Sequence, residues 1–590
     1  MENKAIISLR DVTFTYEGGI NAISNVNTTI QQGEFVVVLG PNGAGKSTLC
    51  YLLSGIVPHI YGGRRRGLVS VVGLDPWDQP LYVTAQHCGV LMQDPEVQLF
   101  MPTLKTELAF GPSNLGVPRE KIFERSQEAL SLVRLEGFEE HNPRDLSGGQ
   151  KQRAALASVL TMQPQVLILD EPTSQLDPAG RWEVGEAIER LKKTGELTIV
   201  MTTHETEEIL HLADQVLVLE GGKTVLHGSP KFVFSQSQQL EKVGVKTPSL
   251  ISFQTRLFFS QDKYVHDIKN ANINLTINDV SLRVQQAVEL GKIEVREVSL
   301  DRQSVASENA PVILEAKSLT VKYPGPPSVT ALDGINTKIR KGEMIGIVGQ
   351  NGSGKSTLVK CLVGLLKPFD GEVLFRGENI RKYSVGEMAR RVGLVLQNPD
   401  YQLFTTSCHD EVQFGLKNID VPEDEMEKLV AEALQTVGLF EEADLFPFRL
   451  SFGDRRKLAV AATMALNPEV LILDEPTTAQ DHKGRYQLAD LAKKFHDEKI
   501  GTVIMITHDV DLVANYADRL MVLHNGKILL DGATADVFSQ EMELKKSFVV
   551  PPVAAQLARK LTSIGVMPTA MTLDELYKIL VPKQSNRKEG

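Results

Sequence analysis

The chain has 590 residues, 42% of them hydrophobic and 23% charged, with a formal net charge of -11. Because a single hydrophobic core stops growing near ~250 to 300 residues, this length predicts two domains. The acidic balance argues against a protein that wraps nucleic-acid phosphates, and no apolar run reaches the ~18 to 20 residues that cross a bilayer, so we expect the chain to stay in the cytoplasm.

The first predicted element that carries chemistry is EFVVVLGPNGAGKST, residues 34–48, which indicates a buried strand, a glycine-rich loop and a helix start. In such a loop, backbone N–H groups converge on nucleotide phosphates, the lysine adds a positive charge and the helix dipole favours an anion. The serine after the lysine offers its hydroxyl to Mg2+. An upstream tyrosine can stack on adenine, although ordinary packing explains a lone tyrosine better. The residues predicted to bind the nucleotide are Tyr16, Gly40, Pro41, Asn42, Gly43, Ala44, Gly45, Lys46, Ser47 and Thr48, with Ser47 also a metal ligand.

The four cysteines, Cys50, Cys88, Cys361 and Cys408, are scattered along the chain without a CxxC pair. This pattern favours reduced thiols over disulfides, zinc or an iron–sulfur cluster. We expect all four to be packing residues.

Two further patterns in the first half place acids and a histidine at strand ends. VLILDE predicts a buried strand that delivers Asp170 and Glu171 at its tip, the edge at which open α/β sheets bind ligands. Asp170 is suited to holding Mg2+, and Glu171 to orienting and polarising the attacking water. His204 follows the next strand and is a candidate for the γ-phosphate, although a lone histidine there is more often structural.

The second half repeats these patterns. Lys46 and Lys355 are 309 positions apart and Asp170 and Asp474 are 304 apart, so the first copy has five extra residues in between, which we place near HIYGGRRRG, residues 59–67. The second nucleotide site is predicted at Tyr323, Gly349, Gln350, Asn351, Gly352, Ser353, Gly354, Lys355, Ser356 and Thr357, with Ser356 and Asp474 as metal ligands and Glu475 and His508 as catalytic residues.

The alternation of β-branched runs with helical patterns predicts an α/β fold with a parallel sheet in each copy. The tails of the two copies also resemble each other, and residues 285–310 are polar and read as a linker. We therefore predict nucleotide-binding domains at 1–245 and 311–545, an appendix and linker at 246–310, and a second appendix at 546–590.

With a phosphate loop, LSGGQ, VLILDE, SQLD and a histidine in that order, each copy resembles the nucleotide-binding domain of ABC ATPases. The resemblance implies hydrolysis of ATP with Mg2+ and head-to-tail pairing of the two domains within the chain, each ATP lying between one phosphate loop and the other copy's LSGGQ. It implies catalytic roles for the Q-loop glutamines and nucleotide contacts for the signature residues, namely Gln93, Gln397, Ser147, Gly148, Gly149, Gln150, Ser451 and Gly453.

The stretch QDPEVQLFMPTLKTELAFGPSNLGVP, from Gln93, and its echo from Gln397 are similar to the ATPases of energy-coupling factor transporters, which import vitamins and metal ions. Within that family, the chain resembles the fused double ATPases of HMP/thiamine-type importers. This likeness implies an integral-membrane coupling subunit gripped near the Q-loops, a substrate-binding membrane subunit, and a peripheral place at the cytoplasmic face of the membrane. The residues do not identify the transported substrate.

The signature motif has a different sequence in the second copy. LSGGQKQR, residues 146–153, becomes LSFGDRRK, residues 450–457, so Phe452 brings a ring and Asp454 a carboxylate that repels a nearby γ-phosphate. Gln480 also replaces the leucine of SQLD. Under head-to-tail pairing both changes fall on the ATP at Lys46, Glu171 and His204, so we expect that site to be compromised and the site at Lys355, Glu475 and His508 to be fully equipped.

Two other classes of protein compete with a transporter ATPase. Soluble tandem ABC ATPases that act on ribosomes or DNA usually carry a basic helical linker, whereas this linker is mixed and the chain is acidic. A non-hydrolysing nucleotide sensor is disfavoured because Glu171 and Glu475 are both present. The sequence therefore favours transport.

Overall fold

The structure, a computed structural model, describes residues 5–174, 176–209, 212–258, 276–300, 310–325, 328–419, 421–476, 482–499 and 501–583. The chain divides into two compact units, Met1–Val280 and Ser281–Gly590. Each unit holds one copy of the repeat. The finer domain boundaries given above stay a prediction.

Each unit is built around a six-stranded sheet whose strands run parallel except for the last. Several central strands are buried along their whole length, as continuous apolar runs predict for a sheet covered on both faces. The first sheet has the order β5 (Cys88–Leu91), β6 (Val166–Asp170), β7 (Thr198–Thr202), β3 (Phe35–Leu39), β8 (Gln215–Glu220) and β9 (Lys223–Gly228). The second has the order β16 (Val392–Val395), β17 (Val470–Asp474), β18 (Thr502–Ile506), β13 (Met344–Val348), β19 (Arg519–His524) and β20 (Lys527–Ala533).

The register of these sheets brings the predicted site segments to one edge. Asp170 pairs with Thr202, and Thr202 also pairs with Val38, two residues before the phosphate loop. In the second copy Ile506 pairs with Asp474 and with Ile347 in the same way. The predicted α/β fold with two phosphate-loop domains in tandem is therefore confirmed.

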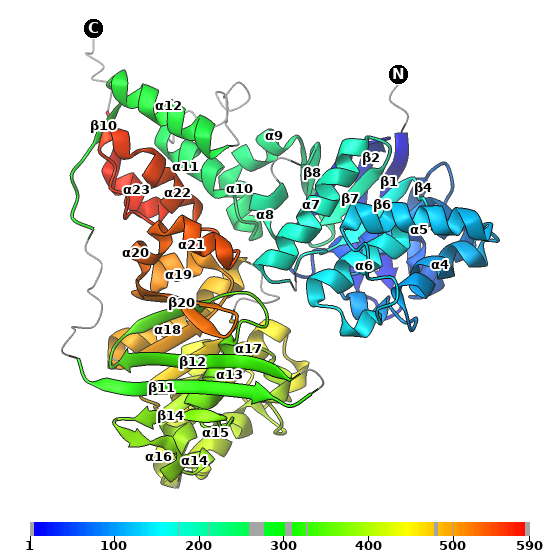
Figure 1. Ribbon diagram of the computed structural model, residues 1–590. Helices are drawn as coiled ribbons and strands as arrows, with labels where there is room; N and C mark the ends of the chain where they lie inside the picture. Colours follow the sequence, from blue (N-terminus) through cyan, green and yellow to red (C-terminus); the bar gives the residue numbers. More distant parts are fainter. Residues whose placement is uncertain are drawn as a thin grey trace. The chain divides into compact units, whose positions relative to one another are not determined.

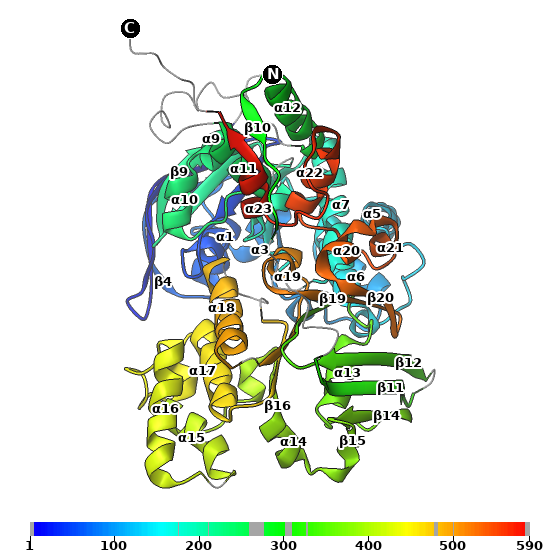
Figure 2. The ribbon, with the colours of Figure 1, turned by 90° about the vertical axis from the view of Figure 1, so that its left-hand side faces the viewer.

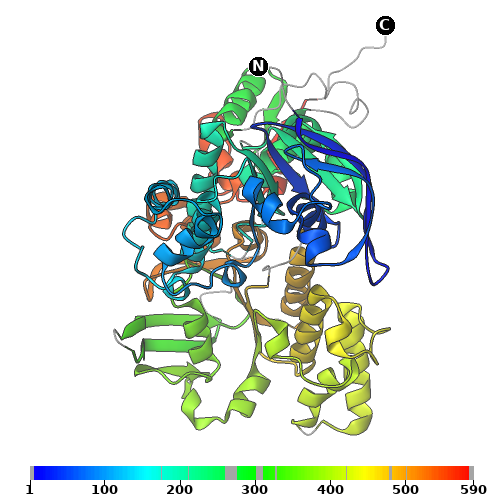
Figure 3. The ribbon, with the colours of Figure 1, turned by 90° about the vertical axis from the view of Figure 1, so that its right-hand side faces the viewer.

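Each copy also has a small antiparallel sheet, which the sequence patterns did not indicate. One has the order β2 (Asn21–Gln31), β1 (Ala5–Tyr16) and β4 (Gly63–Val71), seen as the long dark blue strands in Figure 3. The other has the order β12 (Val329–Arg340), β11 (Val312–Tyr323), β14 (Asp370–Phe375) and β15 (Glu378–Asn379), all labelled in Figure 2. Residues with positive φ, such as Asp11 and Ser318, interrupt the register of these strands, so their apolar alternation is broken in the sequence.

A group of helices follows the Q-loop of each copy. The first group is α4 (Leu104–Asn114), α5 (Arg119–Val133) and α6 (Gly148–Leu160), which begins with the LSGGQ glycines. The second is α15 (Cys408–Lys417), α16 (Glu423–Val437) and α17 (Phe452–Ala465), which pack together in Figure 2. Other helices of the described residues are α1 (Lys46–Ser54), α2 (Ile56–His59), α3 (Leu81–His87), α7 (Pro178–Thr194), α8 (Thr206–Ile209), α9 (Pro230–Ser235), α10 (Ser237–Val243), α11 (Ser249–Phe258), α13 (Lys355–Leu362), α14 (Val385–Arg391), α18 (His482–Lys499), α19 (Val510–Tyr516), α20 (Thr534–Ser539) and α21 (Glu541–Lys546).

The five extra residues of the first copy lie where the sequence placed them. Val71 and Phe375, which are 304 positions apart, hold equivalent places in the small sheets, opposite Ile7 and Leu314, whereas the phosphate-loop lysines Lys46 and Lys355 are 309 positions apart. The arginines of this stretch extend strand β4. Arg65 forms a bidentate ion pair with Asp75, at 2.5 and 2.8 Å.

The end of the second unit includes a segment that follows the first copy in sequence. Strand β10 (Ile293–Val295) pairs with β21 (Leu580–Pro582), beside α23 (Leu573–Ile579) in Figure 1. Gln285 of α12 (Ile277–Glu289) donates to the Lys560 carbonyl at 3.1 Å, at the end of α22 (Val553–Lys560). The second appendix is therefore completed by residues from the linker region.

The structure also bears on the expectations for the cysteines and for membrane-spanning segments. All four cysteines are free and buried, as packing residues should be. Among the described residues, no helix has the length and apolar character to cross a membrane.

Candidate functional site

The phosphate-loop lysine of each copy is the first residue of a helix. Lys46 begins α1 and Lys355 begins α13, and each is 6% exposed. A Cβ on Gly45, whose φ is 99°, would lie 2.4 Å from a backbone carbonyl oxygen, so only glycine fits before the lysine. Lys46 Nζ donates to the carbonyl oxygens of Gly40 and Pro41 at 3.0 and 3.2 Å, and Lys355 makes the matching bonds at 2.7 and 2.9 Å. The loop thus closes around the ammonium group.

The two predicted metal-ligand aspartates end their strands. Ser47 Oγ and Thr202 Oγ1 donate to Asp170 Oδ1 at 3.2 and 2.6 Å, and burial raises the pKa of Asp170. In the second copy, burial and the charge of the adjacent glutamate raise the pKa of Asp474 to about 6, although the hydrogen bond from Ser356 acts to lower it. Asp474 Oδ1 is buried and has no hydrogen-bond partner among the residues that the structure describes. A buried carboxylate oxygen beside a serine hydroxyl fits a hard divalent cation such as Mg2+.

The two predicted catalytic glutamates share an unusual backbone and a histidine partner. Glu171 and Glu475 both have a φ of 49°, which costs about 1 to 2 kcal/mol for a non-glycine residue and is typical of functional sites. His204 Nε2 lies 2.9 Å from Glu171 Oε1, and His508 Nε2 lies 2.9 Å from Glu475 Oε1. Burial raises the pKa of Glu171, but the hydrogen bond and charge of His204 and the charge of Lys46 outweigh it, so the pKa is lowered overall.

The Q-loop glutamines are held differently in the two copies. Gln93 Nε2 donates to Glu171 Oε2 at 3.2 Å and to Ser174 Oγ at 3.3 Å. In the second copy the backbone carbonyl of Gln397 accepts a bond from Arg456 at 2.6 Å. The first copy thus brings its lysine, both carboxylates, the histidine and the glutamine into one cluster.

Each predicted adenine-stacking tyrosine lies against the threonine that follows the phosphate-loop serine. The Tyr16 hydroxyl is 3.1 Å from Thr48 Oγ1, and the Tyr323 hydroxyl is 3.4 Å from Thr357 Oγ1. Tyr323 is 39% exposed, so its ring has a free face. The contact places both rings beside the phosphate loop, as a base-stacking role requires.

The unaltered signature forms a regular helix start. Ser147 and Gln150 form a capping box, in which Gln150 N donates to Ser147 Oγ at 3.3 Å and Ser147 N donates to Gln150 Oε1 at 2.9 Å. A Cβ on Gly149 would lie 2.8 Å from Gly180 Cα, so this glycine lets α6 pack closely on α7. Gly148 has more room, since its nearest neighbour would be 3.6 Å away.

The altered signature replaces this capping box with charged contacts. Ser451 Oγ accepts from Asp454 N at 3.1 Å and donates to Asp454 Oδ2 at 2.7 Å, while Lys457 Nζ lies 2.9 Å from Asp454 Oδ1. Burial raises the pKa of Asp454, but the bonds from Lys457 and Ser451 lower it overall. The Phe452 ring lies under the guanidinium groups of Arg455 and Arg456. Gln480, the other altered position, lies outside the described residues.

Three residues that the sequence did not single out belong to these clusters. Thr202 ends the strand beside Asp170 and bonds both Asp170 and the Glu171 N–H, and Ser174 bonds Gln93. A hydroxyl residue at a strand end next to the acids is the signal that could have found Thr202. Arg456 lies near the end of the altered signature motif, which gives no sign of its role, and only its contacts reveal its place.

The protein-family description "ABC transporter" matches residues 23–174 and 332–478. A putative ABC transporter ATP-binding protein of Caldanaerobacter subterraneus is 40% identical over 569 residues, covering 95% of this chain and 97% of that protein. A putative HMP/thiamine import ATP-binding protein of Bacillus subtilis is 33% identical over 544 residues, covering 91% of this chain and 93% of that protein.

Solved structures similar to this chain include cbiO1 of Clostridium perfringens, described as part of the ABC transporter complex cbiONQ. It is 36% identical, with a TM-score of 0.36, and covers 40% of this chain and 94% of that chain. MJ0796, described as a bacterial ABC transporter cassette, is 28% identical, with a TM-score of 0.35, and covers 38% of this chain and 99% of that chain.

Proposed function

The chain belongs to the ABC transporter family, as a tandem ATP-binding protein with two ATPase domains, and from that premise we propose that it powers an energy-coupling factor type importer at the cytoplasmic face of the cell membrane. The observation that carries the proposal is the set of phosphate loop, carboxylate pair and histidine, present twice in a chain whose relatives are named for transport and import. A soluble ATPase acting on ribosomes or DNA is not favoured, because these relatives carry transporter names.

At each site the residues of one copy would share the work of ATP hydrolysis. The phosphate-loop lysine, held among backbone carbonyls, provides a positive charge for the β- and γ-phosphates. The glutamate, fixed by its strained φ and its histidine, orients the attacking water and accepts its proton. Mg2+, held by Ser47 and Asp170 or by Ser356 and Asp474, neutralises phosphate charge when bound.

The two ATP sites should be unequal. In the head-to-tail pairing that the family likeness implies, Ser451 serves the ATP on Lys46 and Ser147 serves the ATP on Lys355. The Ser451 hydroxyl already donates its proton to Asp454, whereas the Ser147 hydroxyl acts as an acceptor in its capping box. A phosphate beside Ser451 would therefore be repelled by the Asp454 carboxylate and would receive no hydrogen bond from the Ser451 hydroxyl, which already donates to Asp454. Both effects support a weaker ATP site at Lys46.

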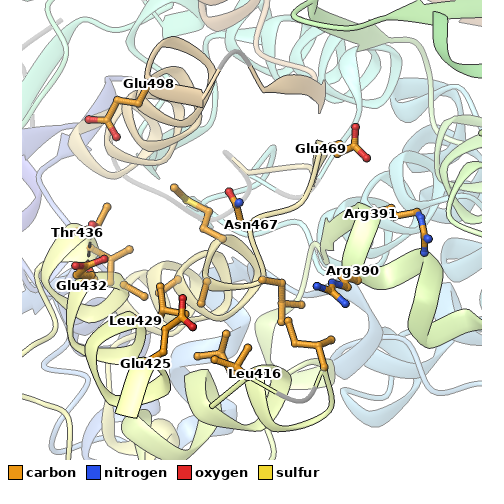
Figure 4. A pocket seen from close by; sticks show the side chains of 18 of the residues that line it. Arg390, Arg391, Leu416, Glu425, Leu429, Glu432, Thr436, Asn467, Glu469 and Glu498 are labelled. Atoms are coloured by element: carbon orange, nitrogen blue, oxygen red, sulfur yellow. Dashed lines mark hydrogen bonds between the residues drawn. The ribbon is translucent and has the colours of Figure 1, made fainter. Parts of the chain in front are cut away.

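A membrane subunit would dock on the helices that follow each Q-loop. In the second copy, exposed aromatic side chains gather there, with Tyr401 83% exposed and Phe404 packed edge-on against Phe414. A cavity of about 750 Å3 lies among α14, α15, α16 and the end of α17. Figure 4 shows acidic side chains of α16 opposite Arg390 and Arg391 of α14, around a floor that includes Leu416 and Leu429. An apolar floor with charged walls suits a short amphipathic segment of a partner.

Co-purification tests this proposal. The tagged chain should be recovered from detergent-solubilised membranes together with an integral-membrane subunit. Charge reversal at exposed positions of segments 94–104 and 398–405 should release the chain while two-site ATP binding persists. Reversal at Lys527 or Asp333, an exposed ion pair outside the helices that follow the Q-loops, provides a matched control because both groups are already solvated. Recovery of every variant with membranes at the wild-type level would count against a transporter role.

A further inference from the structure

Arg456 is a buried cation that joins three parts of the second copy. It lies in α17 and is 3% exposed. One terminal nitrogen donates to the Pro476 carbonyl at 2.8 Å, and the other donates to the Gln397 carbonyl at 2.6 Å. The Phe452 ring centroid lies 5.0 Å from the guanidinium carbon. The signature helix, the Q-loop and the turn after β17 are thus held by one side chain.

The two carbonyls belong to residues next to the chemistry. Pro476 follows Glu475, whose φ of 49° is a strained conformation for a glutamate. A charge-assisted hydrogen bond on the Pro476 carbonyl opposes relaxation of that turn. The bond on Gln397 fixes the backbone from which the Q-loop side chain extends. Arg456 is therefore placed to control the positions of both Glu475 and Gln397 without touching ATP.

The first copy holds the same elements by other means. Gln152, the equivalent of Arg456, is 1% exposed and donates to the Met92 carbonyl at 3.3 Å. There the Gln93 side chain itself bonds Glu171 and Ser174. Among its described residues, the first copy therefore has no arginine that makes the contacts of Arg456, although Gln152 and Arg456 are buried at the same point of their helices.

We propose that Arg456 is a positioning residue for ATP hydrolysis at the Lys355 site, acting through the backbone of Gln397 and the turn that carries Glu475. Phe452 packs against the guanidinium and keeps it in place, which gives the altered signature a role within its own copy. This inference rests on the proposed ATPase function. It adds a residue to the catalytic apparatus that no motif identifies.

A double-mutant cycle tests the inference on the full-length chain. Arg456→Gln, which introduces the side chain of the first copy, should lower kcat for ATP by about tenfold with little change in KM, since small displacements of catalytic groups are costly. In a Gln397→Ala background the same substitution should lower kcat by a clearly smaller factor, because one of the two groups that Arg456 positions is gone. If the role of Arg456 were purely structural, Arg456→Gln would lower kcat by the same factor in both backgrounds.

Arg455→Gln is the matched control. Arg455 is the neighbouring arginine on the same helix and contacts the same ring, but it is 18% exposed and pairs with the Asp400 side chain at 2.5 Å instead of with backbone carbonyls. This variant should retain kcat within about twofold. If Arg456→Gln does not fold, Arg456→Lys, which keeps the charge and one bond, is carried through the same cycle.

The outcomes separate this inference from the function on which it rests. Wild-type hydrolysis that is lost in Lys355→Ala establishes the ATPase independently of Arg456. With that activity in hand, unchanged kcat in Arg456→Gln, or equal losses in the two Gln397 backgrounds, would overturn the positioning role. Absence of hydrolysis by the wild-type chain would instead overturn the proposed function.

Discussion

Ser147 and Ser451 occupy the same place in their helices, yet their hydroxyl groups are used differently. Ser147 accepts a backbone N–H in a capping box, whereas Ser451 also donates to a carboxylate that pairs with Lys457. Each serine is the N-cap of its helix. The direction in which the Ser451 hydroxyl donates cannot be read from the sequence, because it depends on the rotamer of Asp454.

At the residue scale, the glutamine variants of the two catalytic glutamates should differ. In the proposed head-to-tail pairing, Glu475 lies in the site completed by LSGGQ, so Glu475→Gln should reduce single-turnover hydrolysis by more than about tenfold. Glu171→Gln affects the site proposed to be weaker and should cost less than about threefold, because that site would contribute less turnover. Site-resolved single-turnover measurements check this difference. Equal losses of hydrolysis in the two variants would show that both sites hydrolyse ATP at similar rates.

Asp518 gives a prediction on stability and pH. Partial burial raises its pKa to about 6, against the opposing effects of His496, a backbone hydrogen bond at Met344 and Lys493. Because the folded pKa exceeds the unfolded value, this carboxyl stabilises the fold below about pH 4, and the contribution is lost as pH rises through about 6. Asp518→Asn should therefore raise unfolding stability at pH 8 by about 1 kcal/mol after discounting for solvent screening.

Thermal unfolding of Asp518→Asn from pH 5 to pH 8 measures the effect, and the gain over wild type should shrink as pH falls. Asp214→Asn is the control. Asp214 holds the corresponding place in the first copy but accepts bonds from Phe35 N at 2.9 Å and Lys192 Nζ at 3.0 Å. Its amide variant should give no stabilisation at pH 8. A pH-independent gain for Asp518→Asn would contradict the assignment.

At the scale of elements, the sequence predicted the strands with long apolar runs correctly, but it did not predict the edge strands. The central strands are buried on both faces, so their composition alone identifies them. The strands β10 and β21 have three residues each, and neither has a recognisable pattern. They exist because they pair with each other across almost three hundred residues. Tertiary pairing therefore decided these two elements.

Disrupting that pair should loosen the second appendix. Arg296 N donates to the Ile579 carbonyl at 2.8 Å, just past the end of β10. Arg296→Pro removes this donor and should weaken the pairing by about 1 to 3 kcal/mol, whereas Arg296→Ala keeps the N–H. Hydrogen exchange at Leu580 and Val581 should become faster in the proline variant only. Equal exchange in the two variants would mean that β10 does not hold β21.

At the scale of the whole molecule, the two copies supply two complete sets of phosphate-binding and carboxylate residues. If both sets serve hydrolysis, Lys46→Ala combined with Lys355→Ala should reduce ATP turnover by at least ~100-fold, because each lysine supplies charge to the phosphates. The measurement is steady-state phosphate release, with thermal unfolding as a check of folding. Turnover at the wild-type rate in the double variant would disprove the assignment of both sites.

The tandem repeat, the α/β class and the positions of the phosphate-loop, carboxylate and histidine residues could all be predicted from the amino-acid order. These features depend on local order along the chain: a strand, a glycine loop and a helix start occur in a single segment, and repetition removes the ambiguity of each. Which residues contact these groups became visible only in the folded chain. Thr202 reaches Asp170 across neighbouring strands, and Arg456 reaches Gln397 and Pro476 across three elements. Such contacts join residues distant in sequence, and their direction depends on rotamers and burial, which no local pattern encodes.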